Sequence, residues 1–324
     1  MKTIQGRHSN ADSSEQGRHA AMLRSCLSQA EDLFLLAESA AANTSALLYY
    51  YSMLNLAKAL IYLEEPNALV TPKDFSHGLT DRSRIKTAEE FRVDDEELVV
   101  RHGIFKTLHR VLCGDDLAEG TRLSLRSLLR QCGWIGMEMS ELGDPVRLAL
   151  CWVESRVNAE ADLVWAVVFM HNQQLTELCR SVEKFVADNS VVLREFERVA
   201  SEIDTHCQFE SKAVAFSNGD GYATVQAMLR SLRLHRQIKY SSLDAEPQYM
   251  ISLSDCMEAT LPEACGLLAI CFYLSSVARY QPHVYEALRR SSDGWLFEAF
   301  LRQCPVVYAS VMLMYMARAE LMFI

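Results

Sequence analysis

The spacing of apolar residues along this chain predicts helices over most of its length. Over residues 18–42 the apolar positions recur every three or four residues, which is the period of an amphipathic helix. A second helix is expected to begin at the polar residues 43–45 and to end near residue 63, before Pro66. Further helices are expected at residues 118–131, 145–156, 161–187, 191–207 and from residue 263 to the end.

One region breaks this helical period. Residues 209–216, 236–240 and 248–253 are short runs, and a turn-forming segment separates the last two. We therefore expect a small antiparallel β element near residues 209–253. The predicted fold class is mainly α, a multi-helix bundle that carries this one β element.

The same pattern predicts how the chain divides. Residues 1–17 are polar and are expected to form a flexible N-terminus. A helical lobe is expected over residues 18–207. A second lobe, mixed and then helical, is expected over residues 208–324 and should pack on the first.

The net charge and the length of the apolar runs argue against two classes of partner, duplex DNA and membranes. The chain has 32 basic and 42 acidic residues and a net charge of −10. Proteins that bind duplex DNA through its phosphates are normally basic, so duplex DNA is disfavoured as a partner. The apolar runs are shorter than the ~18 residues needed to cross a bilayer, and the N-terminus has no secretory signal pattern. We expect no membrane contact.

The cysteines indicate the compartment. Ten are scattered along the chain without a Cys-x-x-Cys pair, which is typical of free thiols in a reducing cytoplasm. The spacing of the cysteines and histidines indicates no zinc site, so we expect no metal and no cofactor. The expected localisation is cytoplasmic.

The second predicted helix carries a polar stripe on an apolar background. Tyr51, Asn55, Lys58 and Tyr62 follow one another at spacings of four, three and four residues, which places them on one face. A buried unpaired amide costs about 1–3 kcal/mol and a buried charge costs more. Two interpretations follow. In the first, the stripe lines a pocket and Lys58 binds an anion there. In the second, Asn55 forms a hydrogen bond with a neighbouring backbone group, and Lys58 extends to water or pairs with a carboxylate.

His77 is a candidate for the same site. It precedes Gly78 in a loop that follows two prolines, where it either acts as an acid–base group beside Lys58 or bonds a backbone carbonyl as a turn residue. The dipeptide His102-Gly103 repeats this arrangement and leaves the same two alternatives open.

Arg279 completes the candidate set. It is expected in the last turn of a helix that ends before Pro282, where a cation complements the negative helix end. Alternatively its guanidinium contacts a phosphate or a carboxylate. The candidate ligand-binding residues are Tyr51, Asn55, Lys58, Tyr62, His77 and Arg279.

Three segments of the chain resemble a known family. They are Tyr50-Tyr-Ser-Met-Leu-Asn-Leu-Ala-Lys-Ala-Leu, His77-Gly-Leu and Leu274-Ser-Ser-Val-Ala-Arg-Tyr-Gln-Pro. In this order they resemble the YaaC-like family of bacterial proteins. The first helices also resemble the HEPN superfamily, whose helical domains include metal-independent ribonucleases and components of toxin or antiphage-defence systems. These resemblances imply a HEPN-like bundle of bacterial origin.

HEPN ribonucleases carry an arginine followed by four to six residues and a histidine. Arg230 and His235 have this spacing, so they are the catalytic candidates of a ribonuclease alternative. With nine histidines in the chain such spacings arise by chance, and a serine follows Arg230 where a polar amide or an acid is expected. No phosphate-binding glycine loop, nucleophile elbow or His-Glu-x-x-His motif is present.

We therefore expect a non-catalytic helical interaction protein, a component of a bacterial antiphage-defence or toxin–antitoxin type system. Its partner is expected to be another protein or a second copy, as in a homodimer. The alternative is a HEPN-like ribonuclease or a sensor that binds a nucleotide or RNA.

Overall fold

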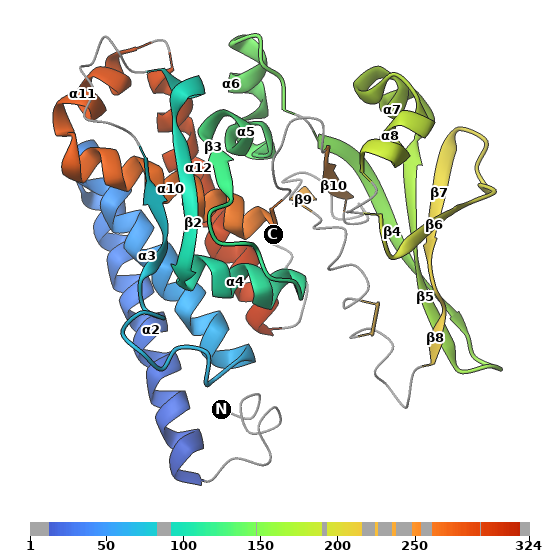
Figure 1. The fold of residues 1–324 in the computed structure, drawn as a ribbon, viewed down its shortest axis with the longest axis horizontal. Helices are drawn as coiled ribbons and strands as arrows, with labels where there is room; N and C mark the ends of the chain where they lie inside the picture. The colour runs from blue at the N-terminus through green and yellow to red at the C-terminus, as the bar shows by residue number, and fades with distance from the viewer. Residues whose placement is uncertain are drawn as a thin grey trace. The chain divides into compact units, whose positions relative to one another are not determined.

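The computed structural model describes residues 13–82, 92–146, 148–189, 193–215, 224–225, 235–237, 248–253, 261–291 and 293–317. The chain divides into two compact units (Figure 1). Of the described residues, those up to Pro145 and those from Ala264 onward form the helical unit, and those from 146 to 263 form the sheet unit. The division expected between residues 207 and 208 falls inside a strand of the sheet unit, and residues 1–12 of the expected flexible terminus lie outside the described residues.

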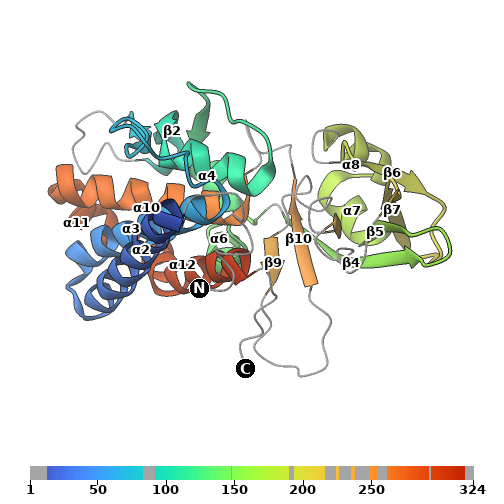
Figure 2. The ribbon, with the colours of Figure 1, turned by 90° about the horizontal axis from the view of Figure 1, so that it is seen from below.

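Long helices build the core of the helical unit. Helices α2 (Ser13–Ser39) and α3 (Ala42–Glu64) form a hairpin, and the Ser52 hydroxyl of α3 donates to the carbonyl of Ala30 at 2.7 Å. This close approach is possible because Ala30 is small and buried. Helix α10 (Glu263–Tyr280) lies beside α3 and is buried over most of its length (Figure 2). Helices α11 (Pro282–Arg290) and α12 (Gly294–Ala317) follow it.

A small antiparallel sheet belongs to the same unit. Its strands are β1 (His77–Asp81), β2 (Glu97–Gly103) and β3 (Arg122–Ser124), in the order β1-β2-β3. The short helices around it are η1 (Val93–Asp95), α4 (Ile104–Cys113), α5 (Leu125–Arg130), η2 (Gly133–Ile135) and α6 (Gly136–Glu141).

The junction between β1 and β2 depends on Gly103, which lies opposite His77 in the ladder. Gly103 has φ 135° and ψ −161°, a region that glycine alone occupies readily. A Cβ atom there would lie 2.3 Å from the Ser76 hydroxyl oxygen. That hydroxyl donates to the carbonyl of His102 at 2.6 Å, and the Ile104 N–H donates to the carbonyl of Ser76 at 2.9 Å. These contacts fix where β1 begins.

The sheet unit is built on one antiparallel sheet with the strand order β6-β7-β5-β4-β10-β9, and β8 also pairs with β5. Side chains of two short helices join the core on one face of this sheet. The elements are β4 (Leu148–Asn158), β5 (Leu163–His171), α7 (Asn172–Cys179), α8 (Val182–Asp188), β6 (Phe196–Val199), β7 (His206–Ser211), β8 (Val214–Ala215), β9 (His235–Gln237) and β10 (Gln248–Ser252).

This α+β architecture corrects the prediction of a mainly α bundle with a small β element at residues 209–253. The expected helix at residues 145–156 is strand β4, and the expected helix at 191–207 contains β6 and the start of β7. The first half of the expected helix at 161–187 is β5. The antiparallel pair β9 and β10 is only one edge of a much larger sheet.

The position of β5 explains the error. It pairs with β4 on one side and with β7 on the other, and side chains on both of its faces, such as Val168 and Phe169, are buried. A strand that is buried on both faces has an uninterrupted apolar sequence instead of an alternating one. From the sequence alone, such a run cannot be distinguished from a buried helix.

Helix α12 is long and apolar enough to span a membrane by length and composition. Most of its most apolar stretch is buried inside the structure, as in the core helix of a soluble protein. This finding is weak evidence for a membrane span.

The Gly103 junction gives a stability prediction. Gly103→Ala should lower the free energy of unfolding by roughly 3 kcal/mol or more, because strain at φ 135° adds to the collision with Ser76. Gly120→Ala is the matched control. Gly120 also has a positive φ, 89°, but a Cβ atom there meets nothing within 4 Å, so the expected loss is about 1 kcal/mol. Denaturant unfolding measures both, and equal losses would contradict the role given to the junction.

Candidate functional site

The polar stripe predicted on the second helix lies on α3. Asn55 is buried, whereas Tyr51 and Lys58 are half-buried. The Lys58 ammonium donates to the Asn55 side-chain oxygen at 3.2 Å, so each is the other's partner. Burial lowers the pKa of Lys58, and the nearby Cys26 thiol opposes that shift. In the described part of the chain no carboxylate lies within ion-pair distance of Lys58.

His77 lies at the start of β1, beside α3 and α10. Its Nδ1 lies 2.6 Å from the Tyr50 hydroxyl oxygen. The imidazole ring also packs near the rings of Tyr50, Tyr51 and Phe272, with centroid distances of 5.4, 6.2 and 5.8 Å. Side chains from α3 and α10 therefore hold the histidine through both a hydrogen bond and ring contacts.

The protonation state of His77 follows from its surroundings. Burial lowers the pKa of His77, and the positive charges of Lys58 and Arg279 lower it further. The imidazole is therefore neutral at pH 7. Burial raises the pKa of Tyr50 well above the ordinary phenol value, so this hydroxyl keeps its hydrogen. We infer that the phenol donates to Nδ1 and that Nε2 carries the imidazole hydrogen.

Arg279 lies in the last turn of α10, as predicted, and its side chain reaches α3. One guanidinium N–H donates to the Tyr51 hydroxyl at 3.3 Å, and the guanidinium lies over the Tyr280 ring, 4.9 Å from its centroid. Arg279 is exposed, and no carboxylate in the described ranges lies within ion-pair distance of it. Asp81, at the end of β1, accepts a hydrogen bond from the Ser276 hydroxyl of α10 at 3.1 Å.

The structure therefore brings together five of the six candidates, Tyr51, Asn55, Lys58, His77 and Arg279, which we call the polar cluster. Its side chains come from α3, β1 and α10. Tyr62 also lies on α3, where burial together with Cys26 of α2 raises its pKa to about 12, but unlike Lys58 it does not act on His77. We place Tyr62 outside the polar cluster.

The second His-Gly dipeptide, His102-Gly103, stabilises the turn before β1. The His102 ring bonds Asp74 at 2.8 Å, and the other carboxylate oxygen of Asp74 accepts from the Thr71 N–H at 2.6 Å. Hydrogen bonds from Thr71 and His102 hold the pKa of Asp74 well below its ordinary range. His102 thus fastens the turn before β1, whereas His77 faces α3.

The ribonuclease candidates are not placed by the structure. Arg230 lies outside the described residues. His235 begins β9, and its side chain also lies outside what is described.

The sequence analysis missed another group of functional side chains. His109, Cys113 and Asp115 meet at the end of α4, and one potential metal-ligating atom from each lies within 4.8 Å of the others. A histidine and a cysteine four residues apart on a helix are the signal for such a group, and this signal is weaker than the clustered cysteine and histidine spacing of the zinc motifs whose absence led to the expectation of no metal.

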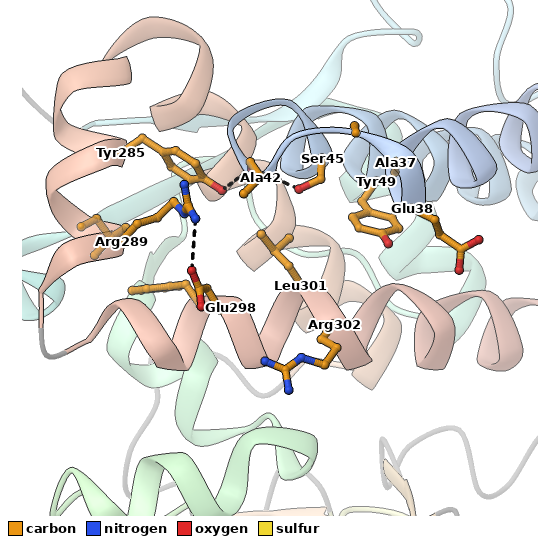
Figure 3. Close-up of a pocket in the computed structure, with 13 residues that line it drawn as sticks. Ala37, Glu38, Ala42, Ser45, Tyr49, Tyr285, Arg289, Glu298, Leu301 and Arg302 are labelled. Atoms are coloured by element: carbon orange, nitrogen blue, oxygen red, sulfur yellow. Dashed lines mark hydrogen bonds and ion pairs between the residues drawn. The ribbon is translucent and has the colours of Figure 1, made fainter.

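A hollow of about 290 Å³ lies elsewhere in the helical unit, between the α2–α3 hairpin and helices α11 and α12 (Figure 3). Two of its charged groups, Arg289 and Glu298, already engage each other. Arg289 donates to Glu298 at 3.3 Å and to the Asn43 side-chain oxygen at 3.1 Å. The Tyr285 hydroxyl donates to the carbonyl of Ala42 at 3.2 Å. Arg289 is therefore already paired with a carboxylate, unlike Lys58 and Arg279 of the polar cluster among the described residues.

A protein-family model described as YaaC-like Protein matches residues 2–316. The chain belongs to the YaaC-like family. The match covers both units and all of the polar cluster. No curated protein and no solved structure matches this YaaC-like protein. The comparisons do not show the HEPN resemblance, which stays a prediction.

The lowered pKa of His77 predicts a pH dependence. Because the unfolded chain takes up a proton near the ordinary pKa of 6.5 and the folded protein does so only at lower pH, protonation favours unfolding. The contribution is complete above about pH 6.5 and is lost as the pH falls below that value.

The comparison is wild type against His77→Gln, with the free energy of unfolding measured between pH 5 and 7.5. The wild-type value should fall more steeply toward acid. Since the pKa of His206 is also lowered by burial, only the difference between the two proteins reports on His77. Identical slopes would contradict the assignment.

Proposed function

We propose that this YaaC-like protein binds a phosphate-bearing ligand of the nucleotide or RNA type at the polar cluster, and that it acts as a sensor. The observation that carries the proposal is the convergence of donors from three elements. The positive charges of Lys58 of α3 and Arg279 of α10 both act on His77 of β1, and neither cation has a carboxylate partner among the described residues.

The chemistry of the polar cluster suits a phosphate. A guanidinium offers two parallel N–H donors, and an ammonium offers a compact charge, both of which bind phosphate oxygens. The hydroxyl of Tyr51 accepts from Arg279 and therefore keeps its own hydrogen to donate. Lys58 is half-buried, so a bound anion would offset the cost of its desolvation. The exposed ring of Tyr280 lies under the Arg279 guanidinium and adds an aromatic surface next to this donor.

We propose binding rather than catalysis at this site. The Nδ1 of His77 is occupied by the Tyr50 hydroxyl, so the imidazole serves as an N–H donor instead of a general base. A metal-independent ribonuclease that uses Arg230 and His235 is the alternative implied by the HEPN resemblance, and no described contact supports it.

Titration calorimetry with inorganic phosphate, mononucleotides and a short single-stranded RNA tests the site. Lys58→Ala and Arg279→Ala should each weaken binding at least about tenfold, the value of one lost charge-assisted contact. The melting temperature should stay nearly unchanged in Arg279→Ala, because that side chain is exposed. Arg302→Ala, an exposed arginine of α12, is the control and should bind as wild type. Loss of folding in Arg279→Ala, or wild-type affinity in both cluster variants, would refute the proposal.

We also propose, as a second function, that the protein works through contacts with other proteins in the cytoplasm, as a component of a bacterial defence or toxin–antitoxin type system. One observation favours contact with a second copy or a partner protein. Helix α12 exposes apolar side chains, among them Val306 at 45%, Leu313 at 42% and Tyr315 at 37% of their areas. Exposed apolar groups on one element are common at interfaces.

Gel filtration with light scattering tests self-association. The wild type should be dimeric at micromolar concentration, and Leu313→Asp should shift it to monomer without lowering the melting temperature, because Leu313 is exposed. Val157→Asp, which changes an exposed residue of β4, should leave the dimer intact. A wild type that stays monomeric would exclude a homodimer.

A further inference from the structure

Three side chains with metal-ligating atoms meet where α4 ends. His109 and Cys113 are four residues apart and share one helical face. They are 1% and 6% exposed, and the Cys113 sulfur lies 3.7 Å from His109 Nε2. Asp115 follows two residues later, with its carboxylate 3.9 Å from His109 Nδ1.

Gly114 brings Asp115 back toward the helix. It adopts the left-handed conformation, φ 77°, and its N–H donates to the carbonyl of Arg110 at 2.8 Å, which ends α4. The reversed chain places the backbone carbonyl of Asp115 at 3.2 Å from His109 Nδ1. The approach of Asp115 to His109 therefore results from the local helix C-cap at Gly114, without contacts from distant parts of the chain.

The backbone contact decides which nitrogen of His109 can bind a cation. A carbonyl oxygen only accepts, so Nδ1 carries the hydrogen and Nε2 has the lone pair. Metal-ligating histidines are commonly oriented by a bond of this kind from the other ring nitrogen. Nε2 is also the nitrogen that faces the Cys113 sulfur.

The distance between these two atoms fits tetrahedral zinc. With Zn–N near 2.0 Å and Zn–S near 2.3 Å, neighbouring ligand atoms are separated by about 3.5 Å. The observed 3.7 Å between Nε2 and Sγ is close to that value. The same three side-chain types also form nucleophilic triads, but the thiol and the imidazole here are buried, which suits an ion and leaves no access for a substrate.

We propose that His109, Cys113 and Asp115 form a binding site for Zn²⁺. His109 Nε2 and Cys113 Sγ already face each other, and the partly exposed Asp115 carboxylate, which lies on the Nδ1 side of the ring, turns toward the ion to complete the site. Thiolate and imidazole ligands select zinc over the hard cations Mg²⁺ and Ca²⁺. Binding replaces the S–H bond of Cys113 with a sulfur–zinc bond, and the proton goes to solvent. The bound ion would join the end of α4 to the segment that leads to β3. The site shares no residue with the polar cluster, so the two proposals fail or succeed separately.

Cobalt substitution tests the site directly. Full-length protein stripped of metal by a chelator is titrated with Co²⁺, and Zn²⁺ affinity is measured by competition with a chromophoric chelator. We expect one equivalent of Co²⁺ to give a thiolate-to-cobalt charge-transfer band with the intense visible bands of tetrahedral coordination, and Zn²⁺ to abolish both. Zinc should also raise the melting temperature.

Variants assign the ligands. Cys113→Ser should abolish the charge-transfer band, and Asp115→Asn should weaken Zn²⁺ binding at least about tenfold. Asp116→Asn, a neighbouring carboxylate with 61% side-chain exposure, is the matched control and should bind as wild type. Cys132→Ser removes one thiol of the buried pair Cys132 and Cys304, whose sulfurs are 3.6 Å apart, and should keep the band.

Circular dichroism without metal establishes that each variant is folded. If Cys113→Ser fails to fold, the comparison of Asp115→Asn with Asp116→Asn decides, because both side chains are at least partly exposed. Absence of stoichiometric Co²⁺ or Zn²⁺ binding by the wild type would overturn the proposal. So would a band that persists in Cys113→Ser, a band that Cys132→Ser removes, or equal affinities for the two aspartate variants.

Discussion

The pairing of β1 with β2 at a glycine is the constraint on which the polar cluster depends. Because Gly103 has no side chain, the backbone of Ser76 passes close enough to fix the first residue of β1 opposite it. That residue is His77, and the Tyr50 hydroxyl of α3 then holds its ring. A short strand thus positions a histidine against two long helices that supply its neighbours. The hydrogen bond between His102 and Asp74 stabilises the turn before β1 and therefore the same junction.

The polar cluster combines an apolar interior with a charged rim. The phenol of Tyr50 and the ring of Phe272 desolvate one side of His77, which keeps the imidazole neutral. Lys58 and Arg279 lie where they are half-buried or exposed, and each has a neutral oxygen as its hydrogen-bond acceptor. Cations that bond neutral acceptors retain their charge for an incoming anion, whereas Arg289 of the α11–α12 hollow is already paired with a glutamate. This difference is why we assign ligand binding to the polar cluster.

The two units are built from different parts of the chain. The helical unit takes its segments from both ends of the chain, and the sheet unit is built from the central part. Every residue of the polar cluster and of the His109–Cys113–Asp115 group belongs to the helical unit. The core of the sheet unit is formed by its own strands and by α7 and α8. The family match extends over both units, so the sheet unit is part of what defines a YaaC-like protein.

The sequence by itself determined the long helices of the helical unit, α2, α3 and those from residue 263 onward, and the shared face of Tyr51, Asn55 and Lys58, because a helical period is a local property of neighbouring residues. It also determined the family, through motifs that span the chain. Only the tertiary structure decided that residues 148–171 form paired strands, since pairing on both sides of β5 hides the alternation that marks a strand. It also decided which His-Gly dipeptide faces α3, and it showed Asp115 folded back onto His109 by a left-handed glycine. Contacts between distant segments, and the backbone conformation at single glycines, leave no periodic signal in the order of residues.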